Sequence, residues 1–375
     1  LFWAIFLPWG ARYSVDSISN PSSEKSFFGV AVLGYLMLQF SLYFFSALMK
    51  TSPEWRTEGS ALYFALNIDQ MTWPVGKWLL GFPGLLKFLS LSTFYIELIS
   101  PFLLLIPFKS NFFRMIFFIL ICSLHLCIAS VLYVGLFYLI GVVTVIGLLS
   151  GSAMDIMEAK FKSFRRFAFL MFNGFSQLFN SLISFQLKIK INLPAFLSYQ
   201  FKLFKNGFLY FVICFNLLWC IGNLPGANFK VNQNFHWFAY MFRLDQDWGM
   251  FAPEVFKEDG WYIYEAELEK NSKDSNRKIF IDINRDGKIV DYKKPENIIA
   301  LFQDDRWRKF GEVWPREPDK VKKEFCRYLK NKWNTNNPNR RIANLNIVYM
   351  KEITKKNYIP STPERTVVCD CENWN

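Results

Sequence analysis

The sequence contains few histidines and few charged residues. Among its 375 residues there are 2 histidines, and only 20% of the residues are charged. With so few histidines we expect no bound metal, because protein metal sites draw heavily on imidazole ligands. The chain also lacks a Walker loop, a dinucleotide fingerprint and a nucleophile elbow, which argues against a soluble nucleotide enzyme.

Apolar and aromatic residues are abundant instead. Hydrophobic residues make up 52% of the chain and aromatic residues 19%, with 42 phenylalanines. This composition excludes a disordered chain or a small disulfide scaffold and indicates a membrane protein. We predict an α-helical multi-pass transmembrane bundle over residues 1–226 and a C-terminal extramembrane α+β domain over residues 227–375.

A membrane-spanning helix needs about 20 mostly apolar residues to cross a hydrocarbon layer of roughly 30 Å. Five segments are predicted to span: 27–49, 79–108, 112–130, 131–150 and 207–224. A sixth apolar stretch, Phe167–Leu187, carries polar residues at steps of three and four, so we expect an interfacial helix over about 160–190. A sixth span is the alternative. Because the chain opens without Met inside the apolar run Leu1–Trp9, we expect that its true N-terminus is missing.

The net charge of +12 is distributed unevenly along the chain, and this distribution predicts the membrane topology. Residues 1–229 hold 16 basic and 8 acidic side chains, so the excess lies in the apolar part of the chain. This favours membrane lipids as partners and argues against nucleic acid. Eight of the basic residues lie in 158–205, which predicts a cytoplasmic position for that stretch. The loop 50–78 and the C-terminal domain are then expected to meet on the opposite side.

The C-terminal domain shows short patterned segments. Strands are predicted at 261–268, 278–283, 288–292 and 342–353, and a helix at 319–333 with Asp319 as its N-cap. The stretch Asp282–Gly287 imitates half of a calcium loop. Because position twelve would be Lys293 where calcium binding needs Glu, a hairpin turn is the stronger prediction.

The C-terminal cysteines are expected to form a disulfide rather than a metal site. Four of the seven cysteines lie in apolar segments, where a thiol is an ordinary small hydrophobe. Cys369 and Cys371 are separated by one residue, whereas paired zinc ligands prefer at least two. If the domain lies outside, Cys326 can bridge to either of them and leave one thiol free.

Three ionisable residues in or beside apolar segments are candidates for function. Lys50 ends an apolar helix, where a lysine usually anchors its ammonium in the headgroups. The sharper alternative is a general base, kept neutral by burial in a pocket of low dielectric constant. His125 is either a helix-packing residue or a functional one. Glu97 is buried in its segment and needs a partner, either a lysine or a second proton carrier.

Several short stretches resemble a known membrane family. The sequence reads Gly-Ala-Arg-Tyr-Ser-Val-Asp at 10–16, Lys-Thr-Ser-Pro-Glu-Trp at 50–55 and Trp-Gly-Met-Phe-Ala-Pro at 248–253, and His125 lies in a Leu-His-Leu context. In order and spacing these resemble the HTTM membrane family, which includes the vitamin K-dependent γ-carboxylases. The resemblance covers residues 1 to about 150 and again 240–265.

The resemblance implies a chemistry for these residues. Lys50 matches the carboxylase base, which deprotonates a reduced vitamin K, and His125 falls where the carboxylases also carry a histidine. A reduced lipid quinone is thus the implied cofactor, with a protein or peptide as a possible substrate. Arg12, Asp16 and Trp55 would line the pocket, although Arg12 and Asp16 can also pair with each other one helical turn apart. Ala11 stands where the carboxylases have a histidine, which puts carboxylation itself in doubt.

Two alternatives to a quinol-dependent, carboxylase-like enzyme stay open. One is a non-catalytic membrane protein that binds lipid or scaffolds a partner. The other is a proton-coupled transporter that uses Glu97 and His125, although the sequence lacks the paired broken helices that favour transport. The membrane would be the cell membrane in a bacterium, or the endoplasmic reticulum in a eukaryote.

Overall fold

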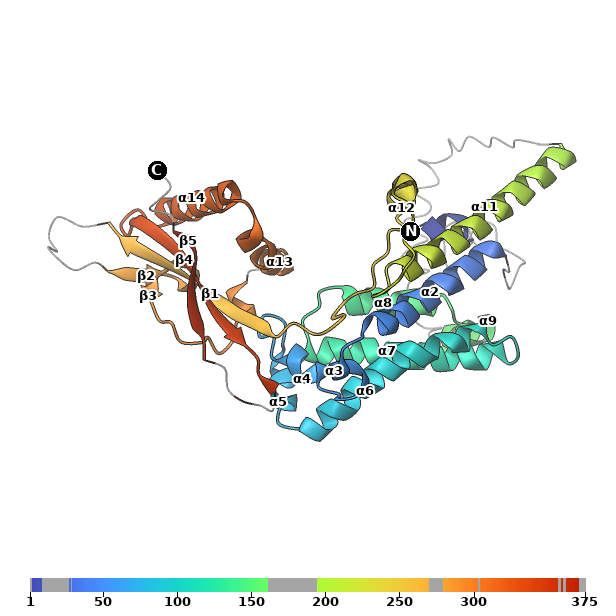
Figure 1. Cartoon of the computed structure of the whole chain (residues 1–375), viewed down its shortest axis with the longest axis horizontal. Coiled ribbons are helices and arrows are strands. Elements are labelled where there is room, and N and C mark those ends of the chain that lie inside the picture. Colours follow the sequence, from blue (N-terminus) through green and yellow to red (C-terminus); the bar gives the residue numbers. More distant parts are fainter. Residues whose placement is uncertain are drawn as a thin grey trace. The chain divides into compact units, whose positions relative to one another are not determined.

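The structure is a computed structural model that describes residues 2–8, 27, 29–160, 194–269, 279–302, 304–356, 359 and 362–370. The chain forms two compact units (Figure 1). The first comprises Leu1–Ser52, Leu91–His125 and Leu139–Pro253, and the second comprises Pro53–Ser90, Leu126–Tyr138 and Glu254–Asn375. The predicted interfacial helix Phe167–Leu187 and the candidates Arg12 and Asp16 lie outside the described residues.

Four helical segments of the described chain are long and apolar enough to cross a membrane. They are α2 (Val30–Met49), the run Pro83–Leu105 formed by α6 (Pro83–Ile99) and η3 (Ser100–Leu105), α7 (Ser110–Val131) and the part Tyr199–Gly222 of α11 (Ala195–Gly222). They match four of the five predicted spans. Large apolar side chains point outward on all four segments, most of them on the last three, as expected for surfaces that face lipid rather than water.

The prediction of a spanning helix over 131–150 is wrong for these residues. The helix there is α8 (Phe137–Ile146), whose 10 residues reach only about 15 Å. The chain leaves the helical conformation before it, because Leu132 pairs with Thr72 in an isolated bridge and Gly135 adopts a φ of 59°. A left-handed glycine interrupts a helix, so the apolar run is divided although its composition stays continuous.

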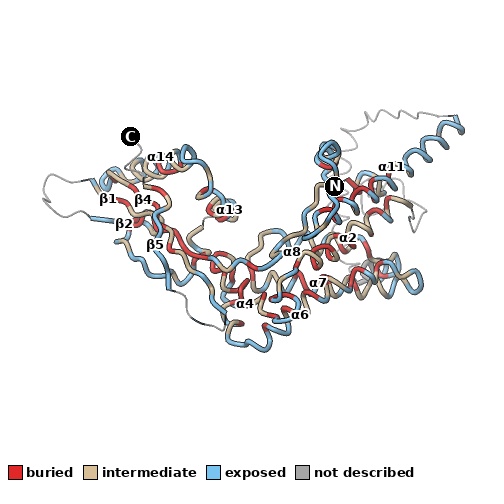
Figure 2. The backbone as a smooth tube through the Cα atoms, in the orientation of Figure 1, coloured by how far each residue is buried: buried red, intermediate tan, exposed pale blue. Residues whose placement is uncertain are grey.

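The first unit is built around α2. Half of the α2 span is buried, compared with 22% for the α7 span. Helix α2 packs against α11 and η3, and its Leu36 and Tyr43 share an apolar cluster with Phe117 of α7. Figure 2 shows buried residues along α2. The remaining elements of this unit include η1 (Phe2–Phe6), α9 (Gly151–Lys160), η4 (Gln233–Phe235) and α12 (His236–Phe242).

The second unit contains a five-stranded antiparallel sheet in the order β3-β2-β1-β4-β5. Its strands are β1 (Glu258–Leu268), β2 (Phe280–Asp282), β3 (Lys288–Ile289), β4 (Ile342–Ile353) and β5 (Glu364–Asp370). The four predicted strands are all present, and β5 was not predicted. The β2–β3 pair turns through Asp286 and Gly287, both at positive φ, which confirms the hairpin.

Helices cover this sheet. They are α13 (Asp305–Val313), followed by η7 (Trp314–Arg316), and α14 (Asp319–Asn336), which packs against β4 and β5. The predicted helix at 319–333 is confirmed, but Pro318 rather than Asp319 is the N-cap, and Asp319 lies in the first turn. The N-terminal part of the unit adds α3 (Pro53–Arg56), α4 (Ala61–Leu66) and α5 (Pro74–Leu79), and η5 (Ile283–Arg285) and η6 (Ile299–Leu301) lie in the connections.

The C-terminal cysteines meet at the edge of this layer. Cys326 of α14 is disulfide-bonded, and its Sγ also lies 2.9 Å from the Sγ of Cys369 on β5. Cys371, the third residue of the predicted set, lies outside the described residues.

Candidate functional site

The end of helix α2 places a lysine inside the first unit. Lys50 is the C-cap residue, and its backbone N–H donates to the Ala47 carbonyl at 3.1 Å. Only 3% of the residue is exposed. A lysine that only anchors a helix keeps its ammonium in water or among headgroups, so the burial of this side chain does not fit the anchoring role.

Glu97 of α6 is the partner of Lys50. The Nζ atom of Lys50 lies 2.5 Å from Oε2 of Glu97, and it also donates to the Ser46 hydroxyl at 2.8 Å. Ser46 and Lys50 are four residues apart, which places them on the same face of α2. Of the two partners that were left open for Glu97, a lysine or a second proton carrier, the structure has the lysine.

Lys50 and Glu97 depend on each other, because each is the counter-charge of the other in the interior. Taking an isolated ammonium or carboxylate out of water costs roughly several kcal/mol even after the surroundings relax, so neither group is stable here without the other. The contact between Nζ and Oε2 therefore leaves neither charge uncompensated in the interior of the unit.

A second polar contact lies two turns earlier on the same helix. The hydroxyl of Tyr43 is 3.0 Å from Nε2 of His125 on α7, and both side chains are buried. Gly141 of α8 leaves the room for this ring, because a Cβ at that position would lie 2.3 Å from Nε2. Tyr43 and Lys50 are separated by about 10 Å along the helix axis, at 1.5 Å per residue. The predicted pair Lys50 and His125 therefore belongs to two neighbouring contacts along α2.

The stretch Trp248–Pro253 lies beside the end of α2. The backbone N–H of Ser52 donates to the Pro253 carbonyl at 3.2 Å, and a Cβ on Gly249 would lie 3.6 Å from the Met49 side chain. Two stretches that are about 200 residues apart in the sequence thus hold the backbone that carries Lys50. Trp55 belongs to the second unit, where it is buried within α3.

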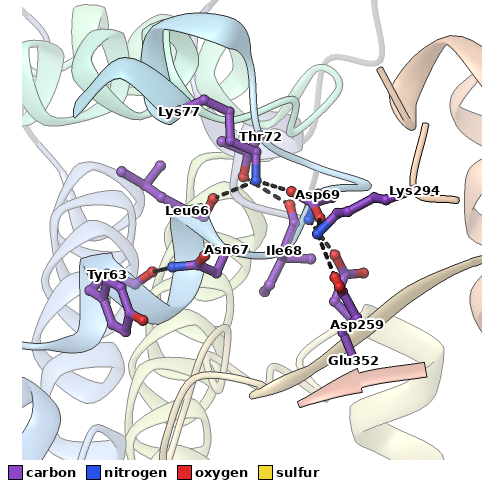
Figure 3. Close-up of polar contacts among 10 residues, drawn as sticks. All are labelled: Tyr63, Leu66, Asn67, Ile68, Asp69, Thr72, Lys77, Asp259, Lys294 and Glu352. Carbon is purple, nitrogen blue, oxygen red and sulfur yellow. Dashed lines mark hydrogen bonds and ion pairs between the residues drawn. The ribbon is translucent and has the colours of Figure 1, made fainter. Parts of the chain in front are cut away.

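The second unit holds a charged cluster that the sequence did not reveal as a group. The Asp69 carboxylate pairs with the ammonium groups of Lys77 and Lys294, and Lys294 also pairs with Glu352 (Figure 3). The backbone N–H of Asp69 donates to the carboxylate of Asp259 at the start of β1. These contacts join residues of the predicted loop 50–78 to the C-terminal sheet within the second unit, and the side of the membrane on which they lie stays a prediction.

Burial changes the proton affinity of two groups in this cluster. It raises the pKa of Asp259 to about 7, although the Gly260 backbone N–H and the ammonium groups of Lys294 and Lys77 oppose the shift. It lowers the pKa of Lys77 to about 8, and the charge of Lys294 adds to that shift. The pKa of one carboxyl and the pKa of one amine in this partly buried cluster are therefore both shifted toward neutral pH.

The stability of the protein should fall as the pH rises from about 4 to about 7 because of Asp259. Its folded pKa of about 7 exceeds the reference value of 3.8, so the folded chain binds a proton in this window that the unfolded chain releases. The contribution is at most about 1.4 kcal/mol per pH unit. We expect the Asp259→Asn variant to lose this slope, because the amide cannot ionise. Denaturant unfolding at a series of pH values measures the effect.

A matched control for this experiment is Glu258→Gln. Glu258 is the preceding residue of β1, is exposed and pairs with Lys351, so the variant makes the same charge change outside the cluster. The backbone N–H of Asp69, the carboxylate of Glu352 and the phenol of Tyr349 also face Asp259 and stay in place in both variants. An unchanged slope in Asp259→Asn would show that another group carries the pH dependence.

The described residues contain no candidate metal site. No group of three or more His, Cys, Asp or Glu side chains among them is arranged to hold an ion. The chemistry that these residues can perform is proton transfer, at the Lys50–Glu97 pair and at the cluster around Asp69. Comparisons with protein-family models, with curated proteins and with solved structures found no match to this chain.

Proposed function

We propose that the protein is a multi-pass membrane enzyme that removes a proton from the hydroxyl group of a lipid-soluble hydroquinone, with Lys50 as the base. The observation that carries the proposal is the buried Lys50, which lies 2.5 Å from the carboxylate of Glu97 at the end of the most enclosed apolar helix. A buried amine with a counter-charge in place is a suitable proton acceptor in an apolar medium.

The membrane position follows from the apolar surfaces and the charges. The outward side chains of α6, α7 and α11 include Phe88, Ile119 and Phe204, which are at least 55% exposed and suit contact with lipid tails. We place the C-terminal sheet and its helices on the non-cytoplasmic side, because Cys326 is disulfide-bonded and disulfides persist in oxidising compartments. The basic stretch 158–205 is then cytoplasmic.

The side chains at the end of α2 fit a hydroquinone. A hydroquinone supplies a weakly acidic hydroxyl and two electrons on an apolar ring. An amine, a carboxylate and the Ser46 hydroxyl provide the acceptors that such a hydroxyl needs, and apolar helices surround them. The similarity of Lys50 and His125 to positions in the HTTM family supports the same chemistry. The proposal stops short of carboxylation, because Ala11 replaces a histidine of that family.

Each of these residues has its own role in the proposed proton transfer. Glu97 accepts the proton of the Lys50 ammonium, which leaves a neutral amine with its lone pair available. Lys50 then takes the proton from the substrate hydroxyl, and the Nζ–H bond forms as the O–H bond breaks. Ser46 accepts a hydrogen bond from Nζ and fixes the direction of the amine. Tyr43 and His125 are positioning residues in this scheme, since their contact holds α2 against α7.

Lys50→Arg tests the proposal with a reporter phenol. Arginine retains the charge and the pairing with Glu97, but it cannot act as a base near neutral pH. 1-Naphthol partitions into lipid, and its absorption moves to longer wavelength when it ionises. We expect the wild-type protein in lipid nanodiscs at pH 7 to produce the naphtholate band, and Lys50→Arg to reduce it by at least about tenfold. Lys87→Arg, which changes an exposed lysine of α6, should leave the band intact.

The result separates the alternatives. Binding of naphthol without ionisation in the wild-type protein would contradict the enzyme and favour a lipid-binding or scaffold role. A potential-dependent proton flux in liposomes that is lost in Glu97→Gln and His125→Phe, with no naphtholate band, would favour the transporter.

A further inference from the structure

Helix α12 runs back along α11 within the first unit (Figure 1). At the start of α12, the ring of His236 lies 5.1 Å from that of Trp219, near the C-terminal end of α11. At the end of α12, the ring of Phe242 lies 6.0 Å from that of Phe208, and the ring contacts of Phe238 fall between these two. The two helices are therefore antiparallel. Trp219 and Phe208 are eleven residues apart, so the contacts extend over about 16 Å of α11.

The chain enters and leaves α12 at the same end of α11. Before α12, the chain passes beside Gly222, where a Cβ would lie 3.3 Å from the Phe229 carbonyl oxygen. After α12, the side-chain amide of Asn223 donates to the Gln246 carbonyl at 3.4 Å. Gly222 is the last residue of α11 and Asn223 is its C-cap. The segment between Asn223 and Gln246 is therefore a hairpin that runs back along α11 and returns.

Helix α12 presents an apolar surface away from α11. Its sequence, His-Trp-Phe-Ala-Tyr-Met-Phe at 236–242, contains no charged residue. Large side chains at its start and on its outer face are at least 55% exposed: Phe235, Trp237, Tyr240 and Met241. Beside them, Tyr210 and Phe211 of α11 are each 52% exposed. The exposed side chains of the two helices thus form one apolar patch, and such a patch is unfavourable in water but suits contact with lipid tails.

The end of α12 is closed without the help of water. Arg243 adopts the left-handed conformation with a φ of 55°, and its N–H donates to the carbonyls of Ala239 and Tyr240. The N–H of Leu244 also donates to the Ala239 carbonyl, at 2.8 Å, and Leu244 is buried. Irregular backbone at membrane depth is tolerated only where the protein satisfies and covers it. The turn after α12 meets that condition at these two donors.

Arg243 is the charged residue of this turn, and its level along α11 lets it avoid the hydrocarbon. It directly follows Phe242, whose ring contacts Phe208, and Lys205 precedes Phe208 by three residues. Lys205 belongs to the basic stretch 158–205 that we place on the cytoplasmic side. The exposed side chain of Arg243 is long enough to extend to the same headgroup layer, as basic side chains do near the ends of membrane helices.

We propose that α12 is a re-entrant helix. It enters the bilayer beside α11 from the side of the C-terminal end of α11, turns the face with Trp237 and Met241 toward lipid acyl chains, and returns to the same side. The extramembrane domain then begins after Gln246 rather than at residue 227. The proposal requires that α11 crosses the membrane. It is independent of the proton transfer proposed for Lys50, so either proposal can fail without the other.

Nitroxide accessibility of the full chain in lipid nanodiscs tests the position of α12. The nitroxide is attached to p-acetylphenylalanine, which leaves the 7 cysteines untouched. Molecular oxygen concentrates in hydrocarbon and a nickel chelate stays in water, so the ratio of their collision rates with the label reports contact with lipid. We expect this ratio in Met241→p-acetylphenylalanine to be at least about tenfold higher than at Gln233, an exposed residue before α12, because the bilayer core excludes water.

Two further positions complete the experiment. Tyr210 on the exposed face of α11 is the matched control, and Trp237 is a second position on the outer face of α12. Both should give a ratio like that at Met241. Frequent nickel collisions at Met241 and Trp237 would place α12 in water, and infrequent collisions with both reagents would mean that protein, such as a second copy of the chain, covers this face. Either result would overturn the proposal, as would nickel access at Tyr210, which would show that α11 does not cross the membrane.

Discussion

The Glu97→Leu variant is expected to unfold with a free energy about 3 to 5 kcal/mol lower than that of the wild type. The reason is that the ammonium of Lys50 would lose the carboxylate beside it while it stays 3% exposed. Breaking a buried ion pair by removing one partner is among the most costly single substitutions. Denaturant unfolding in detergent micelles, followed by tryptophan fluorescence, measures the loss.

A double-mutant cycle identifies the cause of this loss. Lys50→Met should be costly for the same reason, whereas the double variant Lys50→Met/Glu97→Leu replaces both charges with apolar groups and should be far more stable than the sum of the single losses implies. Ser46→Ala provides the matched control, because it removes a neutral partner at 2.8 Å and should cost only about 1 kcal/mol. If the two single losses simply add, Lys50 and Glu97 do not interact as the structure indicates.

The sequence predicted this pair in part. An acid such as Glu97 inside a long apolar run has to meet a partner, because hydrocarbon cannot solvate it, and that argument requires no knowledge of the fold. It cannot select among the basic residues, since the choice of Lys50 depends on how α6 packs beside α2. The contact between Tyr43 and His125 was not predicted for the same reason, since a tyrosine within an apolar helix is not distinctive.

Local patterns predicted most helices and strands, and long-range contacts caused the errors. Residues 131–150 are apolar throughout, but backbone hydrogen bonds to the segment around Thr72 and the turn at Gly135 divide them. Asp259 and Asp69 lie 190 residues apart, and nothing in the alternation of either segment marks them as neighbours. Periodicity reports which side of an element is apolar, but it does not report which element covers that side.

Gly260→Ala is expected to destabilise the second unit by about 3 kcal/mol or more, above the usual cost of one added methyl group. Gly260 lies in β1 opposite Lys351 of β4. A Cβ at this position would lie 2.1 Å from the Met350 carbonyl oxygen, which belongs to the backbone and cannot rotate away. The Gly260 carbonyl also accepts a hydrogen bond from the Gln70 side chain at 3.0 Å, so a shift of this strand would disturb the contact with the segment after α2.

Gly84→Ala is the control for this prediction. Gly84 lies in the first turn of α6, in a part of the chain that also belongs to the second unit, and a Cβ there would meet nothing within 4 Å. The same substitution should therefore be neutral or stabilising by up to about 1 kcal/mol, because alanine favours a helix over glycine. Thermal unfolding of both variants gives the comparison. If Gly260→Ala and the wild type melt at similar temperatures, a Cβ fits at this position. The backbones of β1 and β4 are then further apart there than in the structure.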